Sequence, residues 1–296
     1  MSTSTSQAAT APSSNAAGFA FVEALASELS SGKIELPSFP DIAARVRQVL
    51  SDEFVSSKQI VKVVSSEPAL AAKLIQLANS VALNPGGERV TDLKAAISRM
   101  GLNLVRSASL TFAVEQMRNS PALASLRQPM SELWERCVFV AAMSYVVARS
   151  CSQVNADTAL LTGLLHGVGR LYILARSVDH PALLADQGSY NEVVRDWHAA
   201  IAKCILENWE MSDEIVSAVE YHEDLSREND DEADLTDVLT VATLLVSFHD
   251  HPESIELNME GVAAFDRMEL DHEAVLAILE ESADEVASLQ SALGGH

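Results

Sequence analysis

The chain has 296 residues, of which 48% are apolar and only 5% aromatic, so it is long enough for one large helical domain or two smaller lobes. Its three cysteines form no C-x-x-C pair, which excludes a disulfide framework and indicates reduced thiols in a cytoplasmic protein. No apolar run approaches the roughly 20 residues that span a bilayer. We therefore expect no transmembrane helix.

The charge is concentrated in the last third of the chain. Residues 1–206 carry 18 basic and 17 acidic side chains, whereas residues 207–296 carry 25 acidic side chains and two basic ones, Arg227 and Arg267. Such a surface repels phosphate backbones and anionic lipid, so we expect no nucleic acid and no membrane as partner. It either steers a basic partner protein or simply keeps the protein solvated, and the second interpretation is favoured.

The N-terminal elements surround a connector that contains two prolines. Residues 1–17 are rich in Ser, Thr and Ala and are predicted to be a disordered tail, with neither a signal nor a transit peptide. A first helix is expected over 19–29. Pro37 and Pro40 exclude helix from the connector at 36–40, and Asp41 begins the next helix.

Capping residues mark the helices that follow. Ser56 or Ser57 caps one helix, Pro68 occupies the first turn of the next, and Thr91 or Asp92 caps a short helix that ends at Gly101. A helix over 104–116 completes this set.

The prolines of 119–129 mark the boundary between two lobes, and Ser131 is expected to cap a long helix. Further helices are predicted at 157–166, 168–176, 190–207, 212–222, 234–249 and 271–290. No segment of useful length alternates like a strand, so the fold class is all-α.

Three histidines lie on the apolar faces of these helices. They are His166, His198 and His222, and the chain has no Gly-rich phosphate loop, H-E-x-x-H motif or zinc-knuckle spacing. A single inward histidine is more often a core residue bonded to a backbone carbonyl than a ligand. Their separations of 32 and 24 residues do not by themselves place them in one site.

A set of short motifs resembles the HDOD domain, a relative of the HD-superfamily metal phosphohydrolases, over roughly Leu36–Leu225. The resemblance rests on the order of Leu36-Pro37-Ser38-Phe39-Pro40, Glu67-Pro68-Ala69-Leu70, Leu77-Ala78-Asn79-Ser80, Ala95-Ala96-Ile97, Met100-Gly101, Leu133-Trp134, Gly163 to Leu171, His198, Leu206-Glu207-Asn208-Trp209 and Tyr221-His222. It implies a two-lobed helical bundle, with an N-terminal lobe at 18–128, an HD-like lobe at 129–232, and acidic helices at 233–296 that complete the second lobe.

The resemblance also implies a degenerate active site. HD-type hydrolases share a His…His-Asp…Asp ligand set whose metal activates water. At the matching positions this chain has Arg136, His166-Gly167 and Thr243, so the carboxylates are absent while His166, His198 and His222 remain. We therefore expect no catalytic residue and no cofactor. The alternative is a single transition-metal ion at the three histidines, used by a divergent phosphohydrolase or phosphodiesterase.

The expected function is that of a non-catalytic module in bacterial signal transduction. It would bind another signalling protein or sense a small anionic ligand. Arg136 has two interpretations: it binds an anion in the emptied pocket, or it is a surface residue whose head reaches water, and the second is slightly favoured. Gly163, Gly167 and Gly169 predict close helix–helix packing or a bend near residue 167.

Overall fold

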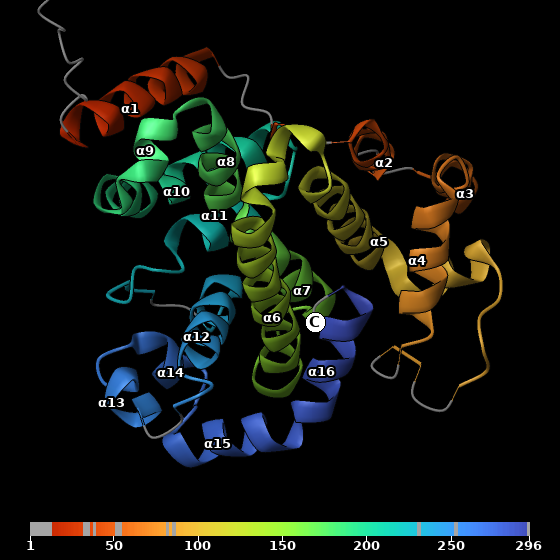
Figure 1. Ribbon diagram of the computed structural model, residues 1–296. Helices are drawn as coiled ribbons and strands as arrows, with labels where there is room; N and C mark the ends of the chain where they lie inside the picture. The colour runs from red at the N-terminus through yellow and green to blue at the C-terminus, as the bar shows by residue number, and fades with distance from the viewer. Residues whose placement is uncertain are drawn as a thin grey trace, which may run out of the picture.

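The computed structural model describes residues 14–31, 36–37, 40–50, 55–80, 83–84, 87–229, 232–251 and 254–294, and within these ranges every regular element is a helix. The all-α, two-lobed prediction is confirmed. The N-terminal lobe contains α2 (Asp41–Leu50), α3 (Ser57–Val64), α4 (Pro68–Ala78) and α5 (Leu93–Arg118), and it lies to one side of α6 in Figure 1.

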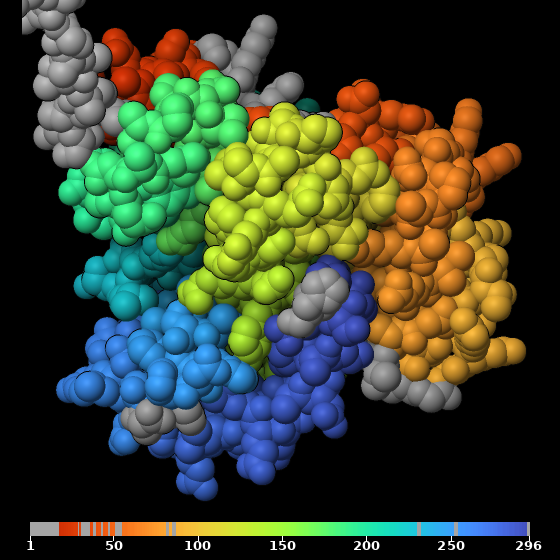
Figure 2. All heavy atoms as spheres, in the orientation of Figure 1, coloured from red at the N-terminus to blue at the C-terminus, as the bar shows by residue number. Residues whose placement is uncertain are grey.

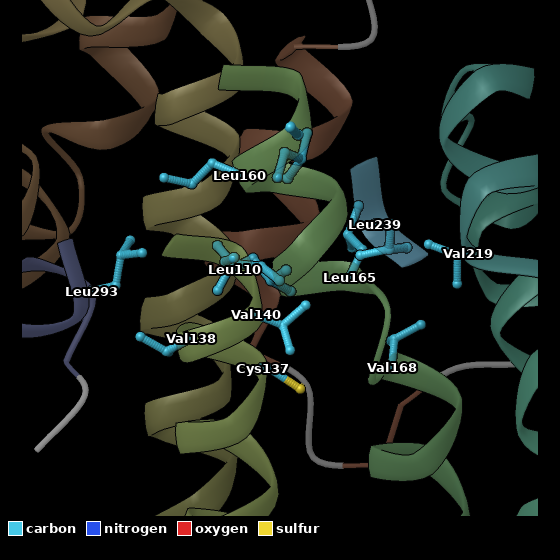
Figure 3. Close-up of a cluster of buried hydrophobic side chains, with 14 of the residues drawn as sticks. Leu110, Cys137, Val138, Val140, Leu160, Leu165, Val168, Val219, Leu239 and Leu293 are labelled. Atoms are coloured by element: carbon cyan, nitrogen blue, oxygen red, sulfur yellow. The ribbon is translucent and has the colours of Figure 1, made fainter. Parts of the chain in front are cut away.

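The second lobe is built around the long helix α6. It contains η1 (Pro121–Leu126), α6 (Arg127–Cys151), α7 (Ala156–Leu165), α8 (Val168–Arg176), η2 (Ser177–Asp179), α9 (Pro181–Ala185), α10 (Gln187–Asn208) and α11 (Asp213–Tyr221). The most extensive packing in the chain joins α6 to α7. One buried apolar cluster runs through both lobes, and Figure 3 shows part of it around Leu110, Val140 and Leu165.

The C-terminal helices close the second lobe. They are α12 (Leu235–Ser247), α13 (Ile255–Met259), α14 (Ala263–Arg267), α15 (His272–Glu281) and α16 (Ala283–Ala292). Both α12 and α16 pack against α6. Figure 2 shows these helices, in blue, reaching the orange N-terminal lobe below α6. The single helix predicted at 271–290 is two helices that meet at Ser282.

Helix α1 (Ser14–Ser31) begins earlier than predicted and packs on the second lobe, while the lobe boundaries themselves stay a prediction. It was expected to begin near residue 19 and to belong to the N-terminal lobe, but it packs against α9 and α10 of the second lobe (Figure 1). Glu28 bonds there to the Tyr172 hydroxyl and the Arg176 guanidinium. The first 13 residues of the predicted tail lie outside the described residues.

Local capping explains several of the helix starts. The side chains of Ser56 and Asp92 accept hydrogen bonds from the backbone of their first turns, so in each predicted pair one of the two residues is the cap. Gly101 has φ 73° and ψ 176°, a conformation open almost only to glycine, and it interrupts α5 as expected. The predicted cap at Ser131 is wrong. Helix α6 begins at Arg127, and Pro129 fits its first turn, where no intrahelical donor is required.

One segment satisfies the length and composition of a membrane span, contrary to the sequence-based expectation. It runs from Ala156 to Asp179, and 89% of its most apolar 18-residue stretch is buried inside the fold. It also bends between α7 and α8 at His166 and Gly167. The segment therefore forms part of the protein core.

The two arginines of the acidic third converge on one buried carboxylate. Asp237, in the first turn of α12, is only 2% exposed. Arg227 lies 3.2 Å from its Oδ1, while Arg267 donates from Nε to Oδ2 at 3.0 Å. These ion pairs tie the loop before α12 and helix α14 to α12. They also use both local cations inside the fold, which leaves the surface of this region strongly acidic.

Candidate functional site

The three predicted histidines come from three different helices. His166 follows the last residue of α7, His222 follows the last residue of α11, and His198 lies within α10. All three are buried, with exposures of 3, 2 and 4% respectively. Each ring places Nδ1 against a carbonyl oxygen of its own helix, at 2.6 Å for Gly163, 2.8 Å for Val194 and 2.9 Å for Val219. A neutral imidazole that donates from Nδ1 leaves a lone pair on Nε2.

The fold brings the three rings together, which their spacing alone did not predict. The rings of His166 and His222 meet edge to face, with their centroids 5.6 Å apart. Nε2 of His198 and Nε2 of His222 lie 3.2 and 3.8 Å from the two carboxylate oxygens of Glu223. Both of these nitrogens are buried without a well-aligned hydrogen-bond partner. The histidines and Glu223 therefore form one cluster.

Burial keeps two of these imidazoles neutral near pH 7. It lowers the pKa of His166 to about 3, and the nearby ring of His222 adds to the effect. Burial also lowers the pKa of His222 to about 4, against the opposing influence of the Glu223 carboxylate. Neutral imidazoles can accept hydrogen bonds or bind a metal at Nε2.

Glu223 is a functional-site candidate that the motif comparison missed. It directly follows His222, so its position beside a candidate ligand was the available signal. The His198 ring and the Arg170 guanidinium hold the pKa of its carboxyl at about 2. Arg170 donates to its Oε1 at 2.7 Å. The pocket thus contains a carboxylate after all, but that carboxylate is already paired with a cation.

The resemblance aligns Gly167 with the aspartate of HD-type hydrolases, and a side chain at residue 167 would fit only if the Cys137 thiol moved. A Cβ atom at residue 167 would lie 2.3 Å from the sulfur of Cys137. Cys137 is fully buried in α6, and burial raises the pKa of its thiol to about 12. Figure 3 shows this sulfur pointing away from α6, toward the side on which Val168 lies. A protonated thiol therefore occupies the space that the first side-chain atom at residue 167 would need.

Gly163 and Gly169 serve helix packing, as the sequence predicted. A Cβ at residue 163 would lie 2.4 Å from the Cα of Ala141 in α6. One at residue 169 would lie 1.9 Å from the carbonyl oxygen of His198 in α10. These contacts hold α7 and α8 close to their neighbours and so fix the positions of His166 and His198.

The two other residues that the resemblance aligns with metal ligands, Arg136 and Thr243, lie on neighbouring faces of α6 and α12. Arg136 is exposed and donates to the Ser247 hydroxyl at 2.9 Å. That hydroxyl in turn donates to the carbonyl of Thr243 at 2.7 Å, and the Thr243 side chain has a buried oxygen without a partner. Arg136 therefore has the position of a surface residue, and its guanidinium is hydrogen-bonded to Ser247 of α12. Its role as an anion-binding residue stays a prediction.

The residues present do not fit the binuclear metal centre of an HD hydrolase. Such a centre needs hard carboxylate ligands that bridge its cations, and the resemblance aligns neither of its carboxylates with an acidic residue of this chain. Across the described ranges, no group of three or more His, Cys, Asp or Glu side chains is placed to hold a metal ion. We therefore derive no metal-dependent step at this site.

The chain is thus an all-helical domain in which buried histidines from α7, α10 and α11 lie together. The HDOD domain family matches residues 36–225, which is 190 of the 296 residues. The chain belongs to the HDOD family.

Relatives of known sequence or structure agree with this assignment. An uncharacterized protein of Treponema pallidum is 20% identical over 259 residues, 84% of this chain and 49% of the relative, so the chain spans about half of that relative's length. One structure, from Shewanella amazonensis and provisionally named a metal-dependent phosphohydrolase, superposes with a TM-score of 0.72 at 23% sequence identity. The superposition covers 94% of this chain and 99% of the Shewanella chain. An HDOD domain protein of unknown function from Geobacter sulfurreducens has a TM-score of 0.62 at 20% identity, covering 91% and 97%. These structures establish the shared fold.

Proposed function

We propose that this chain is a non-catalytic regulatory module of bacterial signal transduction. The observation that carries the proposal is a pair of contacts at the histidine cluster: Cys137 occupies the space beside Gly167, and Arg170 is ion-paired with Glu223. A structure from Marinobacter aquaeolei, provisionally named a signal transduction protein, supports it with a TM-score of 0.57 at 20% identity over 94% of this chain and 66% of its own. The three free thiols fit a cytoplasmic location.

The proposal is tested by an assay for phosphodiester hydrolysis. The purified chain is incubated with bis(p-nitrophenyl) phosphate and, in turn, Mn²⁺, Ni²⁺ and Zn²⁺. We expect no turnover above the metal-only blank, because no carboxylate is free to bridge two cations. Turnover that disappears in His166→Ala would overturn the proposal in favour of a divergent phosphohydrolase, for which the nearness of Glu223 to His198 and His222 is the supporting observation.

We propose further that the module acts by binding another protein at the groove between its lobes. This groove has a volume of about 900 Å³ and runs between α4 and α16. Small and polar side chains line it, among them Ala72, Gln76 and Arg89 on one side and Asp284, Ala287 and Ser291 on the other. Small side chains allow the backbone of a partner segment to approach closely, and their donors and acceptors allow it to be hydrogen-bonded.

A pair of matched variants tests the groove. Ala287→Arg places a long side chain in it, whereas Ala200→Arg makes the same change at an exposed position on α10. Quantitative cross-linking in cells should show a partner that is recovered with wild type and with the Ala200 variant but lost at least tenfold with the Ala287 variant. Equal recovery with both variants would remove the groove as the binding surface.

Ligand sensing is the rival mode of action. It requires an anion near Arg136, so thermal unfolding of wild type and Arg136→Ala is compared across a panel of nucleotides. A stabilisation seen only in wild type would favour sensing. A flat panel would leave protein binding as the mode of action.

A further inference from the structure

One row of side chains attaches helix α1 to the second lobe. Phe21 and Leu25, four residues apart, are each only 2% exposed, and Glu28 lies three residues further along on the same face. The ring of Phe19 is 70% exposed, and Figure 2 shows α1, in red, at the edge of the molecule. This spacing is that of a helix docked in a groove through anchors at positions i, i+4 and i+7.

The groove beneath α1 is formed by α8, α10 and the residue before α9. The His180 ring meets the Phe21 ring edge to face, with the centroids 5.2 Å apart. The Tyr172 hydroxyl and the Arg176 guanidinium both donate to the carboxylate of Glu28. The cavity that remains between these residues has a volume of about 10 Å³, no more than one water molecule needs. Helix α1 therefore fits its groove closely.

The walls of the groove are held in place by contacts that do not involve α1. Helix α10 packs against both α8 and α9, and Arg176 has a second ion pair, to Asp179 at 2.9 Å. After α1 the chain crosses to α2, which packs against α3 and α5 of the N-terminal lobe. An isolated helix of this length is marginally stable in water. Release of α1 would therefore unfold α1 but leave the groove formed.

We propose that α1 is a detachable occupant of a helix-binding groove, and that a partner protein binds the second lobe by placing a helix of its own there. The partner helix carries an aromatic residue, a leucine four residues later and a carboxylate three residues after that. These are the groups that the groove accepts from Phe21, Leu25 and Glu28. The surface is separate from the groove between α4 and α16, so the inference goes beyond the function proposed above.

The carboxylate gives the groove its specificity. One oxygen of Glu28 accepts from Tyr172 and the other accepts from Arg176. Burial, together with Glu28, raises the pKa of the Tyr172 phenol, so the hydroxyl remains a donor near neutral pH. A helix with a basic residue at this place would face the Arg176 guanidinium and leave the hydroxyl without an acceptor, which excludes it as an occupant.

A fluorescein-labelled peptide that carries residues 14–31, titrated with the full chain, tests the proposal. In wild type the tethered α1 competes at an effective concentration on the order of millimolar, so the peptide binds poorly. Phe21→Ala/Leu25→Ala weakens α1 in its own chain, so this variant should bind the peptide at least about tenfold more tightly than wild type. Phe19→Ala is the matched control, because it removes the same ring from the exposed face, and it should behave as wild type.

Two further measurements define the chemistry of the occupant. A labelled peptide with Glu28→Gln should bind the double variant at least about fivefold more weakly, because it loses a charge-assisted bond to Arg176. Peptides selected from a random library on the double variant should carry the aromatic residue, leucine and carboxylate at the spacing of α1.

Hydrogen exchange measured by mass spectrometry shows whether the groove survives the release of α1. In Phe21→Ala/Leu25→Ala the amides of α1 should lose their protection, while those of α8 and α10 should keep it.

Three outcomes would overturn the inference. They are a double variant that binds the peptide no better than Phe19→Ala does, equal binding of the Glu28→Gln peptide, and loss of protection in α8 and α10 together with α1. The last result would make α1 part of the core of the second lobe. These outcomes leave the proposed function unaffected, because the variants change neither the histidine cluster nor the groove between α4 and α16.

Discussion

The sulfur of Cys137 lies 2.3 Å from the point that a Cβ atom at Gly167 would occupy. The two residues are 30 positions apart in sequence, yet the position of the thiol and the absence of a side chain at residue 167 depend on each other. The thiol on α6 fills the volume that a side chain at residue 167 would need, and glycine at 167 allows the thiol to be there. Restoring an aspartate at Gly167 alone would therefore bury a carboxylate against a protonated thiol.

The first prediction concerns the stability of this pair. Gly167→Ala should lower the free energy of unfolding by about 1–3 kcal/mol, because the buried thiol must move. In Gly167→Ala/Cys137→Ala the new methyl group enters the vacated space, so the double variant should lose less than the sum of the two single changes. Denaturant unfolding of all four proteins gives the coupling energy.

Two other glycines provide reference points for that series. Gly169→Ala should be the more damaging change, since its Cβ would meet the His198 carbonyl, part of the backbone, at 1.9 Å. Gly188→Ala should be neutral or slightly stabilising, because its Cβ would make only an ordinary contact with Asp186 at 3.4 Å. Additive behaviour at Gly167 and Cys137 would contradict the pairing.

The second prediction concerns pH. The pKa values of His166 and His222 are lowered in the folded protein to about 3 and 4, whereas unfolded histidine titrates near 6.5. Above that pH neither state binds a proton at these residues, so the two histidines add no pH dependence. Below pH 6.5 the unfolded chain binds protons at these histidines that the folded chain does not bind. The free energy of unfolding therefore falls by about 1.4 kcal/mol per pH unit for each histidine.

Urea unfolding between pH 5 and pH 7.5 measures this effect. The Glu223 carboxyl does not interfere, because its pKa falls from 4.5 to about 2 on folding and its contribution is lost only below this window. His166→Asn should make the decline in stability below pH 6.5 about half as steep, since one of the two buried histidines no longer contributes. An unchanged slope would show that His166 is protonated in the folded state.

The third prediction concerns Asp237. Replacing it by Asn leaves Arg267 without its carboxylate in a largely buried place, whereas Arg227 keeps Asp234, so the change should cost about 3 kcal/mol of stability. Asp266→Asn, an exposed change on α14, is the matched control and should cost less than about 0.5 kcal/mol. Equal effects of the two changes would contradict the role of Asp237 in joining α12 to α14.

Local chemistry made much of the helical pattern predictable. Ser56, Asp92 and Gly101 act through their own backbone or the adjacent turn, so their roles can be derived from a few neighbouring residues. Ser131 failed as a predicted cap because η1 leads directly into α6, which begins at Arg127. Where one helix continues into the next, the first residue of the second helix depends on tertiary packing, which a local sequence pattern does not show.

The candidate site was less predictable than the fold. The resemblance identified the histidines, but the fit of Cys137 against Gly167 arises from packing between α6 and the bend after α7. Glu223 and Arg170 were both present in the quoted motifs or beside them. Their pairing depends on the meeting of α8 with the end of α11, which no local pattern encodes.

Metal analysis of the purified protein tests the central claim most directly. The untagged chain is prepared without chelator and its transition metals are measured by mass spectrometry. A pocket whose carboxylate is held by Arg170 predicts well below one equivalent of any transition metal. A stoichiometric metal that is lost in His166→Ala, together with phosphodiester turnover, would contradict the account.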